Sequence, residues 1–148
     1  MPTLRLEILT VERKLFDEDV NMVVAPGSEG VLGVLPRHTP LLTALSYGEL
    51  QVKKEGEPDR FFAIGGGVME VQPDHVIIMA DSAERADEID VDRARAAQKR
   101  AEELLASSKV TDFSRAEAAL RRSDTRLKVA QRRRSTKDRS AGSKDSVL

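Results

Sequence analysis

The sequence predicts a β plus α protein, in which a β-sheet domain over residues 1–86 precedes a helical hairpin over 87–134. Apolar residues alternate along the first part and recur at helical spacing in the second. The charge divides in the same way. Residues 1–88 carry 8 Lys/Arg against 16 Asp/Glu, whereas residues 89–148 carry 16 against 9. The last stretch, residues 135–148, is polar and aperiodic, which is typical of a disordered tail.

The first part contains several short strands. Two stretches show the alternation most clearly, one through Leu4, Leu6 and Ile8 and the other through Val20, Met22 and Val24. Further strand segments are "ELQVK", "RFFAI", "GVMEV" and "HVIIMA". Turn signals separate them, at Pro26-Gly27, at residues 54–59 and at Pro73-Asp74. Short strands at such close spacing indicate an all-β sandwich or barrel.

The stretch "GVLGVLPRHTPLLTAL", residues 30–45, is too apolar for an ordinary loop. Pro36 and Pro40 each fix φ and remove a backbone donor, which excludes a central strand. We therefore expect a rigid loop at one end of the β domain. Its apolar side chains must cover the core or contact another protein.

Two helices follow. Ala94, Ala97, Ala101 and Leu104 define the apolar face of the first, which Asp90 or Asp92 caps and Ser107-Ser108 ends. Phe113, Ala116, Leu120 and Leu127 define that of the second, with Thr111 or Asp112 as its N-cap. A short connection between them predicts an antiparallel hairpin. Since alanine buries little area, this hairpin should be only weakly held and able to open.

Composition excludes most catalytic chemistry. Cysteine is absent, and no apolar run approaches the roughly 20 residues of a membrane span, so we expect a soluble intracellular protein. No P-loop motif occurs, and the two histidines, His38 and His75, lie on different elements. The "GGG" at Gly65–Gly67 precedes a strand, which favours a sheet bulge or a close backbone approach over dinucleotide binding.

One alternative function follows from charge alone. Residues 121–148 carry 10 Lys/Arg and 3 Asp/Glu, which would suit a small nucleic-acid-binding β domain with a basic C-terminal tail. Against it, only 3% of the residues are aromatic, so no stacking platform for bases is visible. The acidic β domain would also repel phosphates.

Two segments carry a resemblance to a known family. "PGSEGVLGVLPRHTPLLTALSYGEL" is similar to the signature of the epsilon subunit of bacterial F-type ATP synthases, and "FFAIGGGVMEVQPDHVIIMADSAERADEIDVDRARAA" resembles that family's next segment. The resemblance implies a ten-stranded β-sandwich before the two-helix hairpin. It also implies a non-catalytic rotor subunit on the cytoplasmic face of the bacterial plasma membrane, which associates with the membrane only through the complex and binds no nucleic acid.

The resemblance further implies partners and site residues. The β domain would lie between the gamma subunit and the ring of c subunits, with docking residues Glu29, Gly30, Val31, Gly33, His38, Leu41 and Leu42. Some family members have an acidic residue where this chain has Val31. The open hairpin would inhibit ATP hydrolysis through Arg115, Arg121, Arg122 and Arg126, which would contact the catalytic beta subunits. Lys128 and Arg132–Arg134 extend this basic set.

No cofactor for catalysis is implied, but ATP is expected as a regulatory ligand of the closed hairpin. Family members that bind nucleotide share an I/L-D-x-x-R-A motif, which this chain matches at Ile89, Asp90, Arg93 and Ala94. The resemblance adds Glu84, Arg100, Arg122 and Arg126 to this set. Arginine forks suit a triphosphate, and the two carboxylates suit the adenine or ribose end.

Overall fold

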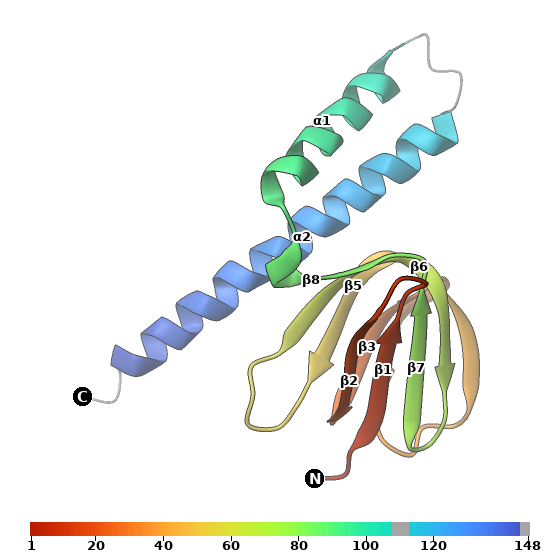
Figure 1. Ribbon diagram of the computed structural model, residues 1–148, viewed down its shortest axis with the longest axis vertical. Coiled ribbons are helices and arrows are strands. Elements are labelled where there is room, and N and C mark those ends of the chain that lie inside the picture. Colours follow the sequence, from red (N-terminus) through yellow and green to blue (C-terminus); the bar gives the residue numbers. More distant parts are fainter. Residues whose placement is uncertain (108–112, 146–148) are drawn as a thin grey trace.

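The computed structural model describes residues 1–107 and 113–145, with side chains described up to residue 132 (Figure 1). A sandwich of strands carries a pair of antiparallel helices on one end. The strands are β1 (Leu4–Leu9), β2 (Lys14–Val20), β3 (Met22–Gly27), β4 (Gly30–Val34), β5 (Leu41–Lys53), β6 (Arg60–Val71), β7 (His75–Ala80) and β8 (Ala83–Arg85). The 3-10 turn η1 (Ala86–Glu88) leads to α1 (Val91–Ala106) and α2 (Phe113–Asp145).

The strands form two layers because the longest two, β5 and β6, take part in both. The first half of β5 pairs with the second half of β6, which also pairs with β7, and β7, β1 and β2 complete the layer. The second half of β5 pairs with β3, which also pairs with β4, while the first half of β6 pairs with β8. Counted by halves, each layer holds five segments, which reconciles eight continuous strands with the ten that the family resemblance implies.

The glycine triplet lies where β6 passes from one layer to the other. Phe62, Ala63 and Ile64 pair with β8, whereas the pairing with β7 begins at Gly67. Gly66 and Gly67 have φ of 86° and 128°, which side chains rarely adopt. A Cβ on Gly67 would also collide with the carbonyl oxygen of Met79. "RFFAI" and "GVMEV" are therefore one bent strand. The expected close backbone approach is confirmed, but there is no bulge, because the register with β5 is the same on both sides of the glycines.

The sandwich core confirms one alternation and corrects another. Leu4, Leu6 and Ile8 are all buried, as the sequence predicts. The second alternation, through Val20, Met22 and Val24, is wrong because the chain bends at Asn21 between β2 and β3. This bend shifts the inward positions of β3 to Val23 and Ala25.

Residues 30–45 are not one loop. Gly30–Val34 is the edge strand β4, and Leu41 begins β5, so the loop is limited to residues 35–40. Both prolines, Pro36 and Pro40, lie inside that shorter loop, where no ladder donor is needed. Arg37 adopts a φ of 68° there, and its backbone N–H donates to the carbonyl oxygen of Pro73 at 2.6 Å.

The first helix of the hairpin, α1, begins and ends at the expected residues. The Asp90 carboxylate accepts the backbone N–H of Arg93 at 3.1 Å, and Ser107 is the C-cap. Ala94, Ala101 and Ala116 are buried between the helices, whereas Leu104 and Phe113 at the far end are exposed. The predicted caps Thr111 and Asp112 lie outside the described residues.

The second helix is long, and only part of it lies on the sandwich. Val129 and Ala130 pack with Ala63 and Ile89 in a second, small cluster that joins the hairpin to the β domain. The backbone of α2 remains helical to Asp145, beyond residue 134, where the sequence places the end of the hairpin. The predicted tail over residues 135–148 has side chains outside the described part of the chain.

Candidate functional site

The joint between the two domains is tied to the sandwich. Arg13, in the β1–β2 turn, holds the Glu88 carboxylate with both terminal nitrogens, at 3.3 and 2.7 Å. Arg85 donates to the carbonyl oxygen of Leu15 at 2.5 Å. The hydrogen bond from Arg13 holds the pKa of Glu88 below its ordinary value. Since η1 is fixed in this way, the chain would have to bend between Glu88 and Val91 if the hairpin changed its position on the sandwich.

A cavity of about 290 Å³ lies where the hairpin rests on the sandwich. Glu84 lines it from β8, and Arg122 and Arg126 line it from α2. Inside it the Arg126 Nε atom lies 3.2 Å from a carboxylate oxygen of Glu84. The rest of the wall is small or uncharged: Tyr47, Ala63, Ile64, Gly65, Ser82, Ala97, Ala119, Ser123 and Thr125. The structure thus brings three of the eight expected nucleotide-binding residues together.

The other five have different positions. Ile89 is buried in the second cluster, Ala94 is buried between the helices, and Asp90 caps α1. Arg93 and Arg100 are exposed and do not line the cavity. They lie one helical turn to either side of Ala97, which does line it, so the three residues share one face of α1.

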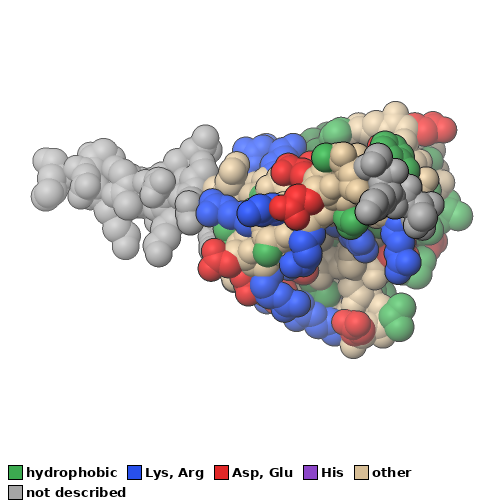
Figure 2. Space-filling model, turned by 90° about the horizontal axis from the view of Figure 1, so that it is seen from above, with side chains coloured by type: hydrophobic (Ala, Val, Ile, Leu, Met, Phe, Trp, Pro, Cys, Tyr) green, Lys and Arg blue, Asp and Glu red, His purple; other side chains and the backbone are tan. Residues whose placement is uncertain are grey.

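Two of the four arginines of α2 that were expected to inhibit catalysis contact the β domain in this arrangement. The Arg121 guanidinium lies over the Tyr47 ring at 6.0 Å, and Arg126 pairs with Glu84. Arg115 and Arg122 are exposed. Lys and Arg side chains gather over the hairpin with acidic ones between them (Figure 2).

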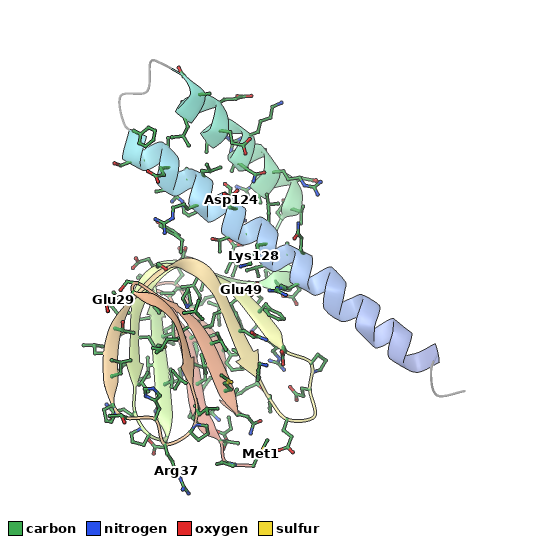
Figure 3. All side chains as sticks on the ribbon, turned by 180° about the vertical axis from the view of Figure 1, so that it is seen from behind. Met1, Glu29, Arg37, Glu49, Asp124 and Lys128 are labelled. Atoms are coloured by element: carbon green, nitrogen blue, oxygen red, sulfur yellow. The ribbon has the colours of Figure 1, made fainter. Side chains whose placement is uncertain are left out.

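The expected docking residues lie in two groups at opposite ends of the sandwich. Glu29 is in the β3–β4 turn, next to the hairpin end, and Arg37 marks the loop at the other end (Figure 3). Gly30 and Val31 accompany Glu29, while His38 and Leu41 belong to the second group. The structure therefore does not place His38 near Glu29, because β4 runs between them. The His38 ring Nδ1 donates to the carbonyl oxygen of Thr39 at 2.7 Å.

An exposed apolar patch, of which the sequence analysis identified only Leu42, occupies the outer face of the first layer. We define it as Leu42, Val68 and Met79, which are 69%, 37% and 48% exposed. Met79 is paired with Val68, and Val68 lies opposite Ala44, two residues along β5 from Leu42. The outward position of every second residue in "GVMEV" and "HVIIMA" is the signal that could have revealed it.

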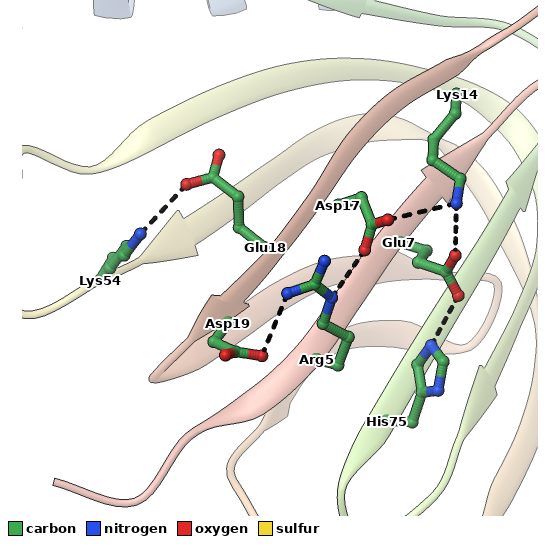
Figure 4. A network of polar contacts seen from close by, with 8 residues as sticks. All are labelled: Arg5, Glu7, Lys14, Asp17, Glu18, Asp19, Lys54 and His75. Carbon is green, nitrogen blue, oxygen red and sulfur yellow. Dashed lines mark hydrogen bonds and ion pairs between the residues drawn. The ribbon is translucent and has the colours of Figure 1, made fainter.

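An ion network covers the neighbouring part of the same face (Figure 4). Glu7 accepts from Lys14 at 2.7 Å and from His75 at 2.6 Å, and Asp17 accepts from Arg5 at 2.7 Å. The Lys14 and His75 hydrogen bonds lower the pKa of Glu7, and the Arg5 hydrogen bond lowers that of Asp17. Hydrogen bonds between acidic and basic side chains thus link β7, β1 and β2 beside the apolar patch.

Neither α1 nor the described part of α2 is long and apolar enough to cross a membrane. Across residues 1–107 and the described side chains of α2, no cluster of three His, Asp or Glu is arranged to hold a metal ion.

Two family models match this chain, one in the β domain and one in the helical hairpin. Residues 3–86 match the family model "ATP synthase, Delta/Epsilon chain, beta-sandwich domain", and residues 87–131 match the family's "long alpha-helix domain". The ATP synthase epsilon chain of Dehalococcoides mccartyi is 51% identical over 136 residues, which is 90% of this chain and 96% of that protein. The epsilon chain of Desulforamulus reducens is 48% identical over 132 residues, which is 87% of this chain and 98% of that protein.

Solved structures place similar folds in ATP synthases. A chain in the mitochondrial ATP synthase of Euglena gracilis, in a structure of its OSCP, F1 and c-ring, aligns with a TM-score of 0.75 and 25% identity over 83% of this chain and 78% of that chain. A chain in the central stalk and c-ring structure of the Tetrahymena thermophila enzyme has the same fold, with a TM-score of 0.60 and 15% identity over 86% of this chain and 96% of that one. Because two family models cover most of the chain and close relatives align along nearly their whole length, the chain belongs to the ATP synthase delta/epsilon chain family, among the epsilon chains.

Proposed function

We propose that this chain is a non-catalytic subunit of the rotor, that its β domain docks onto the gamma subunit and the c-ring, and that its hairpin regulates ATP hydrolysis. The observation that carries the proposal is the unequal attachment of the two parts. The sandwich has a large core of its own, whereas four buried residues join the hairpin to it. A hairpin held so lightly can detach while the sandwich remains folded and docked.

The β domain offers two kinds of docking surface. The apolar patch on the first layer, beside the ion network, suits a protein partner, and we assign it to gamma. The two end regions, at Glu29–Gly33 and around His38, are too far apart for one small contact. We assign one of them to the c-ring and the other to gamma. The chain would then lie peripherally on the cytoplasmic face of the membrane-associated complex.

The hairpin is the regulatory part of the proposal. Closed, it places Arg121 and Arg126 against the β domain. Open, it releases these two arginines and, with Arg115 and Arg122, presents them to acidic surfaces of the catalytic beta subunits. The same side chains would then serve either the closed or the inhibitory position, which makes the two positions exclusive.

ATP is the ligand that we propose for the cavity. Arg122 and Arg126 would bind the phosphates, and Arg93 and Arg100 would close over them from the face of α1 that carries Ala97. ATP would have to separate Arg126 from Glu84, which could then accept from the adenine or ribose. If ATP binds only the closed form, a hundredfold excess over Kd stabilises that form by about 2.7 kcal/mol. High cellular ATP would therefore keep the inhibitor closed.

Reconstitution with the cognate catalytic hexamer and gamma tests the regulatory function. We expect ATP hydrolysis to be slower with the full chain than with a chain that lacks residues 89–148. Charge reversal of Arg122 together with Arg126 should relieve the inhibition, whereas Arg95→Glu, at an exposed position outside the proposed contacts, should not. Equal hydrolysis with full and shortened chains would refute the regulatory role.

Two binding measurements test the ligand and the docking surface. Calorimetry should show ATP binding that Arg126→Ala weakens about ten- to a hundredfold, since a charge-assisted hydrogen bond contributes roughly 1.5–3 kcal/mol. Arg95→Ala is the matched control. Leu42→Asp should weaken binding to gamma without unfolding the chain, because the side chain is exposed in the free subunit. Normal gamma binding by this variant would remove the patch from the interface.

A further inference from the structure

A second contact between the hairpin and the sandwich lies outside the cavity. The Arg132 Nε atom is 3.2 Å from a carboxylate oxygen of Glu49, and its guanidinium lies over the Phe61 ring at 5.4 Å. None of these three residues lines the cavity. The Glu49 side chain is only 13% exposed, so its carboxylate has lost most of its water and depends on Arg132 for compensation.

The position of this contact makes it a clasp over the second cluster. Arg132 follows Val129 by three residues, so the two side chains share a face of α2. Glu49 on β5 is paired with Ala63 on β6, and Ala63 belongs to the cluster together with Val129. The partly buried Phe61 packs against the same cluster. Arg132 therefore covers the apolar contact at the side away from Glu84 and Arg126.

We propose that Arg132, Glu49 and Phe61 form a latch that sets how firmly the hairpin stays closed in the absence of any nucleotide. This rests on the proposed mobility of the hairpin. Arg126 would be exchanged between Glu84 and a bound phosphate, whereas the latch keeps its partners in both cases. The closed state would thus have two separate controls: a nucleotide-dependent one in the cavity and a constant one at the latch.

Opening can be measured by the reactivity of a single thiol, because the chain has no cysteine. Val129 is completely buried, and Cys is close to it in size, so Val129→Cys places one thiol inside the contact. In nucleotide-free buffer its rate of modification reports the open fraction of the full-length chain. In this background we expect Arg132→Ala to raise the rate about five- to thirtyfold, from the sum of an ion pair and a cation–π contact. Glu49→Gln should raise it less, because it removes the ion pair but leaves Arg132 over the Phe61 ring.

Matched variants separate the latch from general loosening. Arg132→Lys keeps the charge but loses the planar fork and the stacking, so its rate should lie between those of the parent Val129→Cys chain and Arg132→Ala. Combining Arg132→Ala with Glu49→Gln should add little to Arg132→Ala alone, since Arg132→Ala already removes both contacts. Arg95→Ala, an exposed arginine on α1, should leave the rate unchanged, and the urea midpoint of the β domain should be constant throughout.

Modification of both Arg132→Ala and Glu49→Gln at the rate of the parent Val129→Cys chain would overturn the latch. The thiol modification rate is independent of inhibition, which is measured as ATP hydrolysis by the reconstituted enzyme with and without residues 89–148. A chain whose thiol rate responds to Arg132 but whose hairpin has no effect on hydrolysis would retain the latch and lose the proposed regulation.

Discussion

The β domain and the hairpin bury different kinds of side chain. The sandwich core contains twenty buried residues, most of them Leu, Ile, Val or Phe, and it connects both layers. The hairpin buries mainly alanines between its helices and meets the sandwich through Val129 and Ala130. Because apolar burial contributes roughly 25 cal/mol per Å², the sandwich can be stable alone, whereas the hairpin depends on its neighbour. This difference gives one chain a rigid part and a part that can change position.

The largest expected effect is a loss of stability in the rigid β domain. Phe62 is fully buried and packs edge-to-face on Phe16, with ring centroids 5.6 Å apart. Phe62→Ala should destabilise the β domain by about 3–5 kcal/mol, through lost transfer energy and the cavity left behind. Urea unfolding followed by circular dichroism measures it, with the half-buried Phe61→Ala as the control. A loss below about 1 kcal/mol would mean that the core can collapse around the gap.

A change in the small cluster should affect only the mobile part. Val129→Ala removes two buried methyl groups, about 1.6 kcal/mol at roughly 0.8 kcal/mol for each carbon. We expect amides at the hairpin–sandwich contact to exchange hydrogen roughly tenfold faster, with the strands of the sandwich unchanged. Leu104→Ala, at the exposed far end of α1, should have little effect. Faster exchange throughout the sandwich would show that the two parts unfold together.

The N-cap of α1 stabilises the start of the hairpin, next to the joint between the two domains. Asp90→Ala should cost about 1 kcal/mol of helix stability, because the backbone N–H of Arg93 loses its acceptor. Exchange should increase in the first turn of α1, while Asp90→Asn, which can still accept, should restore protection. If the alanine and asparagine variants exchange alike, the cap does not hold the helix start.

The smallest effect concerns pH and the outer face of the sandwich. The pKa values of Glu7 and Asp17 are lowered in the folded protein, so their ion network stabilises it above the ordinary carboxyl values, which are 4.5 for Glu and 3.8 for Asp. This contribution should be lost as pH falls through the lowered values. Urea midpoints between about pH 6 and about pH 3 should therefore fall less steeply for Glu7→Gln than for the wild type. Parallel slopes would show that Glu7 adds nothing to acid stability.

The sequence correctly predicted those elements whose signal is local. The alternation of Leu4, Leu6 and Ile8 gave the inward face of β1, and Asp90 gave the start of α1. Alternation failed at Val20, Met22 and Val24, because a single bend at Asn21 exchanges the two faces without changing the pattern of residue types. The lengths of β5 and β6 were also not predicted, since glycines usually end strands and here bend one.

The candidate sites divide in a similar way. The family motifs selected Glu84, Arg122 and Arg126, and the fold brings them to one cavity. Arg93 and Arg100 are exposed and do not line it, and His38, next to Arg37, lies at the opposite end of β4 from Glu29. Of the apolar patch only Leu42 was selected. Val68 and Met79 come from two other strands, and each alone looks like an ordinary strand residue.

By itself the sequence determined the periods of its strands and helices, the caps and turns that bound them, and the family to which its motifs are similar. These depend on residues within a few positions of one another, whose backbone preferences act in any surroundings. Tertiary structure alone decided that Arg132 pairs with Glu49, 83 residues earlier in the chain, and that Arg126 meets Glu84 inside a cavity. Such contacts exist only after α2 docks on the sandwich, because the free energy of docking comes from the shape of both surfaces and not from any one segment.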